Sequence, residues 1–243
     1  MRLITTEAKL YVREPLAAFF GILFPSVLLL VLGNAIPGFT QPADDLGGRR
    51  PIDIYLPIVL ALAIATVTMV TLLGTLALYR ERGVLRRLSA TPVSPVRLLV
   101  AQFVVNLGAL IAGSALAFVA AKVAFDVAPP SNVVGFGIAY LLGAAAMAAL
   151  ALLVAAVTPN AKASNGFGSL VYFPMMFFAG VWTPGPTMPA AARRIADFTP
   201  LGAASRAMQD AWAGSWPQPL HLVVMVAYLG VLGTVAARAF RWQ

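Results

Sequence analysis

Residues 54–79 read IYLPIVLALAIATVTMVTLLGTLALY, a long run of apolar side chains without a single charge. A helix rises about 1.5 Å per residue and the hydrocarbon core of a bilayer is about 30 Å thick, so about 20 such residues are enough to cross it. These residues therefore predict a membrane-spanning helix.

Five other segments have a similar length and a similarly apolar composition. The whole chain of 243 residues is 60% hydrophobic and 11% charged, whereas soluble domains are about 45–50% apolar and about 25% charged. The sequence predicts an all-α integral membrane protein that forms one transmembrane domain over residues 1–243, with six transmembrane helices. The expected spans are residues 16–36, 54–79, 98–121, 133–157, 163–182 and 220–237.

The basic residues indicate how these spans are oriented. If the N-terminus is cytoplasmic, eleven of the 17 Lys and Arg residues lie on the cytoplasmic side, and six of the nine acidic residues lie outside. Loops rich in Lys and Arg stay in the cytoplasm, and an even number of spans returns the chain to the side where it began. We expect a multi-pass protein of the plasma membrane, specifically the bacterial cytoplasmic membrane, with both termini in the cytoplasm.

Several kinds of chemistry are missing from the sequence. There is no cysteine and a single histidine, His221, so we expect no metal site and no catalytic residue. A phosphate-binding loop needs a Gly-Lys pair, which the chain lacks, and its basic clusters between apolar runs do not form a nucleic-acid surface. Ion-driven carriers usually keep an ionisable group in mid-membrane, and none of the expected spans has one. A transporter built from this chain would therefore take its energy from another chain.

Residues 1–15 form a polar stretch ahead of the first span. A helix there has apolar side chains on one face and basic side chains elsewhere, which predicts an amphipathic helix at the membrane interface. Its orientation is expected to depend on Ile4 and Tyr11 on the apolar face and on Lys9 and Arg13 on the polar one. Such a helix either anchors the bundle to the membrane or offers a docking surface to a cytosolic partner.

The cytoplasmic loop at residues 80–97 contains the sequence ERGVLRRLSATPVS at positions 81–94. It predicts a short helix from Glu81 to Ser89 that stops before Pro92. A loop that served only to orient the chain would need the arginines but no apolar ridge, so we expect a helix that docks a partner. The residues expected to couple the two proteins are Glu81, Arg82, Gly83, Leu85, Arg86, Leu88, Thr91 and Pro92.

The region after the fifth span has a pattern of its own. Residues 177–184 read FFAGVWTP, and a proline-rich stretch, a short helix at 188–198, the triplet TPL at 199–201 and a second helix at 205–212 follow. Its tryptophans, Trp182, Trp212 and Trp216, would also suit an aromatic belt at the membrane surface.

Both patterns resemble type 2 ABC exporter permeases. Residues 81–94 resemble the family segment E-R-G-T-L-x-x-L-x-x-T-P-[VI]-S, with Val84 in place of the common threonine. Residues 177–184 are similar to F-x-[SA]-G-x-[WF]-x-P, and Thr199 stands where the family has asparagine before Pro-Leu. The resemblance implies the type V exporter fold, in particular its drug- and antibiotic-resistance branch.

In that family the first segment is a coupling helix that enters a groove of the nucleotide-binding subunit. The second forms a re-entrant extracellular gate, here residues 183–219, and the expected gate residues are Gly180, Trp182, Pro184 and Pro200. The resemblance further implies two copies of a cytosolic ABC ATPase, which bind ATP and Mg, and a second permease chain. We expect a homodimer of permeases, with a heterodimer as the alternative, surrounded by membrane lipid.

The pathway for cargo is expected between spans one, two and five. Methionine and aromatic side chains adapt to bulky amphipathic molecules, although at helical spacing they more often pack or face lipid. The expected lining is Phe19, Phe20, Met69, Asn165, Tyr172, Met175, Met176 and Phe177.

The function expected from the sequence is export of small amphipathic drug-like or natural-product molecules from the cytoplasm. Three alternatives stay open. They are export of lipid-linked glycans or polysaccharides, secondary transport driven by an ion gradient, and a membrane scaffold without a pathway.

Overall fold

The computed structural model describes residues 2–84, 95–184 and 187–239, and among these the chain is helical and contains no strand. The elements are α1 (Arg2–Arg13), α2 (Pro15–Ala18), the π-helical turn η1 (Phe19–Leu23), α3 (Phe24–Ala35), the short turn η2 (Asp44–Leu46), α4 (Pro51–Thr66), the π-helical segment η3 (Val67–Leu72), α5 (Leu73–Glu81), α7 (Pro95–Phe125), α8 (Val133–Val157), α9 (Ala161–Ala179), α10 (Ala190–Asp197), α11 (Pro200–Trp212) and α12 (Pro219–Ala239).

Five stretches of the described chain are long and apolar enough to cross a membrane, which confirms an all-helical protein and five of the six expected spans. They are Pro15–Ala35, Pro51–Glu81, Arg97–Phe125, Val133–Val157 and Pro219–Ala239. Helix α9, which contains most of the expected fifth span, is not among them. Its 19 residues would suffice in length, but Lys162, Ser164 and Asn165 make its first turns polar.

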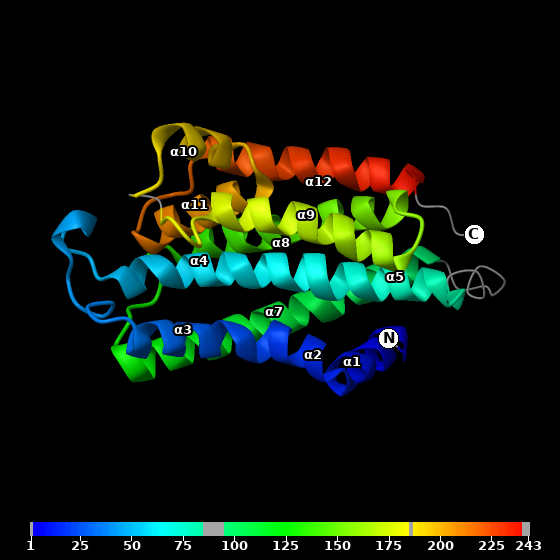
Figure 1. Ribbon diagram of the computed structural model, residues 1–243, viewed down its shortest axis with the longest axis horizontal. Coiled ribbons are helices and arrows are strands. Elements are labelled where there is room, and N and C mark those ends of the chain that lie inside the picture. Colours follow the sequence, from blue (N-terminus) through cyan, green and yellow to red (C-terminus); the bar gives the residue numbers. More distant parts are fainter. Residues whose placement is uncertain (1, 85–94, 185–186, 240–243) are drawn as a thin grey trace.

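Helix α9 nevertheless runs in the direction expected of the fifth span. At one end of the bundle, Arg80 Nη1 donates to the carbonyl oxygens of Ala155 and Thr158, at 3.1 and 2.6 Å, and joins the ends of α5 and α8. At the other end, Ser205 Oγ donates to the carbonyl oxygen of Ala179 at 2.8 Å and joins the end of α9 to α11. Helix α9 therefore runs antiparallel to α8 and returns the chain to the end that holds α10 and α11 (Figure 1).

The central element is the continuous helix formed by α4, η3 and α5. In its apolar stretch 94% of the residues are buried within the protein, compared with 28% in Pro15–Ala35 and 22% in Pro219–Ala239. Figure 1 shows the other long helices beside it, with α1 and the ends of α5 and α12 at one end of the bundle and the α3–α4 connection, α10 and α11 at the other. The first and last spans consequently keep broad apolar faces on the outside.

The first span is held against α7 by a very close approach of the two backbones. A Cβ atom on Gly113 would lie 2.3 Å from the carbonyl oxygen of Gly21, well inside contact distance. Gly21 belongs to the π-helical turn η1, which ends at Leu23, two residues before Pro25. Only glycine allows α7 to lie this close to that carbonyl.

Helix α11 has 13 residues, which span about 20 Å and are too few to cross the hydrocarbon core. It is nonetheless buried, with Leu201 and Met208 fully enclosed, and it packs against α8, α9, α12 and α4. The helix begins at Pro200, five residues earlier than the sequence predicted, because the Thr199 hydroxyl accepts the amide of Gly202 and caps it.

Candidate functional site

The central helix ends where the predicted coupling segment begins. Helix α5 stops at Glu81, Arg82 leaves the helical conformation, and Gly83 has a φ of +65°, a left-handed value that favours glycine. Glu81 is therefore the last residue of α5. The sequence had predicted that a separate short helix begins at Glu81, and this start was wrong. The other expected coupling residues lie outside the described residues, namely Leu85, Arg86, Leu88, Thr91 and Pro92.

A buried carboxylate joins three helices beside this turn. Glu7 of α1 is only 7% exposed, and its Oε2 accepts hydrogen bonds from Tyr79 Oη at 2.8 Å and from Gln102 Nε2 at 2.6 Å. Tyr79 lies near the end of α5 and Gln102 near the start of α7, so Glu7 connects α1 to both helices that flank the predicted coupling segment. The sequence analysis missed Glu7, although its four-residue spacing from Leu3 and Tyr11 puts all three on one helix face.

The four residues of α1 that the sequence predicted at the membrane interface differ in their exposure. Tyr11 is buried and lies directly on Gly21, where a Cβ atom would come within 2.0 Å of the phenol oxygen. Burial raises the pKa of Tyr11 to about 12, so this phenol stays neutral. Ile4, Lys9 and Arg13 are exposed. The apolar face of α1 is thus partly a packing face against η1 and α7.

A cavity of about 610 Å³ opens between the α1–η1 connection and the η3–α5 helix. Leu16 and Phe20 line one wall, and Val70, Gly74 and Leu78 line the other. Its volume falls in the range of about 300–1,000 Å³ that is typical of small-molecule sites.

Of the eight expected pathway residues, Phe20 lines this cavity. Met69 is buried inside the bundle, and the hydroxyl of Tyr172 lies 2.9 Å from Thr66 Oγ1, which joins α9 to α4. Phe19 and Asn165 are exposed, whereas the others are half-buried on α9, namely Met175, Met176 and Phe177. The structure therefore brings part of the expected lining to the η1–η3–α9 side of the bundle.

The expected gate residues lie at the opposite end of the bundle from α1. Gly180 caps the end of α9, Pro184 follows it in the connection, and Pro200 opens α11. The three tryptophans of this region differ in their exposure. Trp182 is exposed, as is Trp216, which suits a surface belt, whereas Trp212 stacks on Phe118 with a centroid distance of 5.4 Å.

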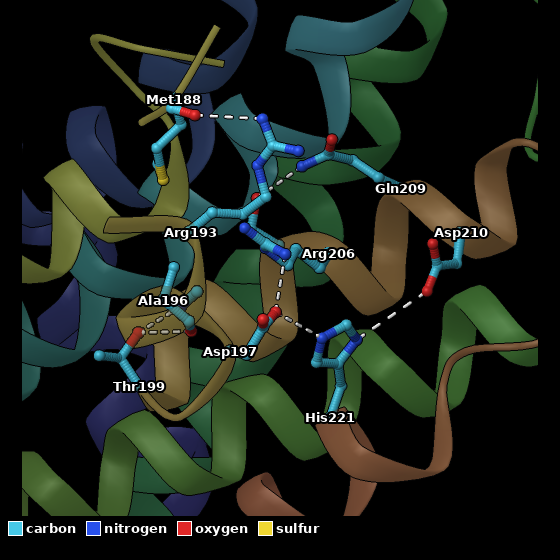
Figure 2. A network of polar contacts seen from close by, with 11 residues as sticks. Met188, Arg193, Ala196, Asp197, Thr199, Arg206, Gln209, Asp210 and His221 are labelled. Carbon is cyan, nitrogen blue, oxygen red and sulfur yellow. Dashed lines mark hydrogen bonds and ion pairs between the residues drawn. The ribbon is translucent and has the colours of Figure 1, made fainter. Parts of the chain in front are cut away.

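A polar network that the sequence did not reveal joins α10, α11 and α12 at this end (Figure 2). Asp197 Oδ1 accepts from Arg206 Nη1 at 2.7 Å and lies 3.0 Å from His221 Nε2. His221 is only 2% exposed. Its other ring nitrogen faces Asp210 Oδ2 across 3.9 Å, too far for a hydrogen bond. One carboxylate thus connects the short helices α10 and α11 to the last span.

Within the described parts of the chain, no cluster of three or more acidic or histidine side chains could hold a metal ion. At the end that holds α10 and α11, Asp197 instead binds Arg206 and His221 (Figure 2). These contacts, like those of Glu7, join separate helices of the chain.

Comparison with known families gives one match. Residues 1–211 match the family described as ABC-2 type transporter. A search of curated proteins found no match. Because the family match covers most of the chain and the structure is a bundle of apolar helices, this protein belongs to the ABC-2 type transporter family and is a membrane permease of that family.

Proposed function

We propose that the chain is the permease subunit of an ABC exporter that moves amphipathic drug-like or natural-product molecules out of the cytoplasm. A separate subunit would hydrolyse the ATP. The observation that carries this proposal is the course of the central helix, which leaves the bundle at Glu81 and turns at Gly83. Directly after this turn comes the segment whose sequence resembles a coupling helix.

The proposed topology has six spans, with α9 as the fifth and both termini in the cytoplasm. In support, α1, the end of α5 and the end of α12 lie at one end of the bundle (Figure 1). Residues 183–219 would form the external gate segment, and α11 would be its re-entrant part, because it is buried yet too short to span.

Docking of two ATPase copies would take place through Glu81, Arg82 and Gly83 and the predicted residues that follow them. Movement of this turn would reach the cargo pathway directly, because α5 and η3 continue from it without a break in the helix. ATP and Mg would be bound by the partner and not by this chain.

A second permease chain would complete the pathway. Helix α9 presents Phe167, Leu170 and Phe173 to the exterior, each more than half exposed. A second copy that covers part of this face would enclose a space that one bundle leaves open. The expected cargo pathway would run along the space enclosed between the two copies.

The test is purification of the chain from its own membranes, followed by transport assays in vesicles. We expect an ATP-binding chain to co-purify at one copy per permease, and we expect vanadate to stop export while a protonophore does not. Transport that persists under vanadate and stops with the protonophore would contradict the proposal and favour an ion-driven carrier. Stimulation of the ATPase by a lipid-linked glycan and not by amphipathic drugs would contradict the proposed cargo.

A further inference from the structure

The cavity beside η3 borders a stripe of the central helix that the other described helices leave partly exposed. Val70 is 50% exposed, although 94% of the apolar stretch around it is buried. Gly74, Leu78 and Arg82 follow at intervals of four residues and also line the cavity. Residues four apart lie above one another on a helix, so this stripe runs from the middle of the span to the turn that precedes the coupling segment.

The opposite wall is the bend between α1 and the first span, with Leu16 and Phe20 as its apolar part. Phe20 belongs to the π-helical turn η1, and Val70 belongs to the π-helical segment η3. The inserted residue of a π turn redirects neighbouring side chains, and such turns are frequent at functional sites. Two adjacent spans therefore carry a π distortion where both border the same cavity.

The lining has the chemistry of a site for amphiphiles. This lining is mostly apolar and also includes Thr71 and Thr75. Its charged residues are Glu14 and Arg82, both at the end nearest α1 and the coupling turn. Arg82 already has an interaction partner, whereas the Glu14 carboxylate forms no hydrogen bond or ion pair with another described residue. Glu14 thus offers a carboxylate to a ligand at the same end of the cavity as the guanidinium of Arg82.

We propose that this groove captures cargo from the cytoplasmic leaflet and that Glu14 selects amphiphiles with a cationic amine group. The inference rests on the proposed export function and adds the charge of the cargo. The apolar body of the molecule lies against Phe20, Val70 and Leu78, and its amine lies at the membrane surface beside Glu14. Near a low-dielectric surface, opposite charges attract more strongly than they do in water.

The test uses the full chain in lipid nanodiscs, without ATP, and two dyes with the same aromatic body. Rhodamine 6G is a cation, and rhodamine B carries an additional free carboxylate. Fluorescence anisotropy gives the affinity for each dye. We expect the wild-type chain to bind rhodamine 6G more tightly. Glu14→Gln should weaken this binding about tenfold, the effect of one favourable charge contact, and leave rhodamine B almost unchanged.

Three further variants act as controls. Glu14→Asp keeps the charge and should keep the preference for the cation. Gly74→Leu should block both dyes, because Gly74 lines the groove and a Cβ atom there has Asn165 Oδ1, at 4.0 Å, as its one neighbour within 4 Å among the described residues. Asp126→Asn removes an exposed acid at the other end of the bundle and should change neither affinity. Gel filtration and circular dichroism check that each variant is folded.

The proposal is overturned if Glu14→Gln weakens both dyes equally or neither, or if Gly74→Leu still binds them. The proposal is also overturned if a structural lipid fills the groove. In that case the wild type would bind neither dye, and mass spectrometry would detect a lipid that is bound to the wild type and absent from Gly74→Leu. If the dye preference holds but no ATPase is stimulated by rhodamine 6G, the groove stands and the export function fails.

Discussion

The hydroxyl of Tyr79 donates a 2.8 Å hydrogen bond to the carboxylate of Glu7, across 72 positions of sequence. Tyr79 lies two residues before the end of α5, so this bond fixes the N-terminal helix to the base of the predicted coupling segment. Gln102 binds the same oxygen from α7, and the three helices are held as one unit.

Removal of the Glu7 carboxylate should loosen this unit. Glu7→Ala would leave the buried donors of Tyr79 and Gln102 without their acceptor, which costs about 1–3 kcal/mol. We expect a lower thermal unfolding midpoint and faster amide hydrogen exchange in α1, measured on the purified chain. Lys9→Ala, which changes an exposed residue of the same helix, is the matched control. Equal rates of amide hydrogen exchange in α1 of Glu7→Ala and Lys9→Ala would show that the hydrogen bonds of Glu7 do not hold this helix in place.

The close approach of α7 to the first span gives a second prediction. Gly113→Val would push a branched side chain into the carbonyl of Gly21, where even a Cβ atom lies 2.3 Å away. The two helices must then separate, and we expect a strong loss of folded protein, measured as the monodisperse fraction in gel filtration. Gly137→Val is the control, since a Cβ there meets no atom within 4 Å. Similar yields for both variants would contradict the packing of α7 on η1.

The polar network that joins α10, α11 and α12 predicts a pH dependence. Burial raises the pKa of Asp210, and the Gln218 backbone hydrogen bond and the charges of His221 and Arg206 offset this only in part. The folded state therefore binds a proton at Asp210 more readily than the unfolded chain does. The ionised carboxylate accordingly costs stability above that raised pKa, and this cost disappears as the pH falls below the ordinary value of about 3.9.

Asp210→Asn should consequently stabilise the protein at pH 8, by about 2 °C in the unfolding midpoint, and have almost no effect at about pH 3.5. Differential scanning fluorimetry at the two pH values measures this. Asp44→Asn changes an exposed acid and should shift neither midpoint. A variant that is less stable than the wild type at pH 8 would mean that the attraction of Asp210 to His221 and Arg206 exceeds the cost of burial.

The coupling segment gives a prediction about activity. Leu85→Asp, or Glu81→Lys, should leave the chain inserted but reduce cargo-stimulated ATP hydrolysis by about tenfold or more, equivalent to 1.4 kcal/mol of lost interaction. ATPase and transport assays on the reconstituted complex measure both activities. Loss of the inserted chain itself would instead assign the segment a structural role.

The sequence predicted what depends on continuous runs of residues. Five spans were confirmed because an apolar stretch such as 54–79 has few alternatives to a membrane helix. The start of α11 was placed too late, since its first turn is buried through tertiary packing and shows little periodicity. Thr199, which replaces the asparagine of the family pattern, caps this helix through its hydroxyl.

The sequence did not predict contacts that join distant parts of the chain. Glu7 was not among the predicted site residues, because its partners come from α5 and α7. Asp197, Arg206 and His221 were likewise invisible as a group, since they meet only when α10 and α11 fold against α12. Such pairings depend on the arrangement of helices, which hydrophobic periodicity does not specify.

The most direct test of the central claim is the accessibility of position 86 from each side of the membrane. The chain has no cysteine, so Arg86→Cys gives a single site for a membrane-impermeant maleimide. We predict labelling in inside-out vesicles, protection there by the bound ATP-binding chain, and no labelling of intact cells. Labelling of intact cells would place the segment outside and contradict the account of an ATP-driven permease.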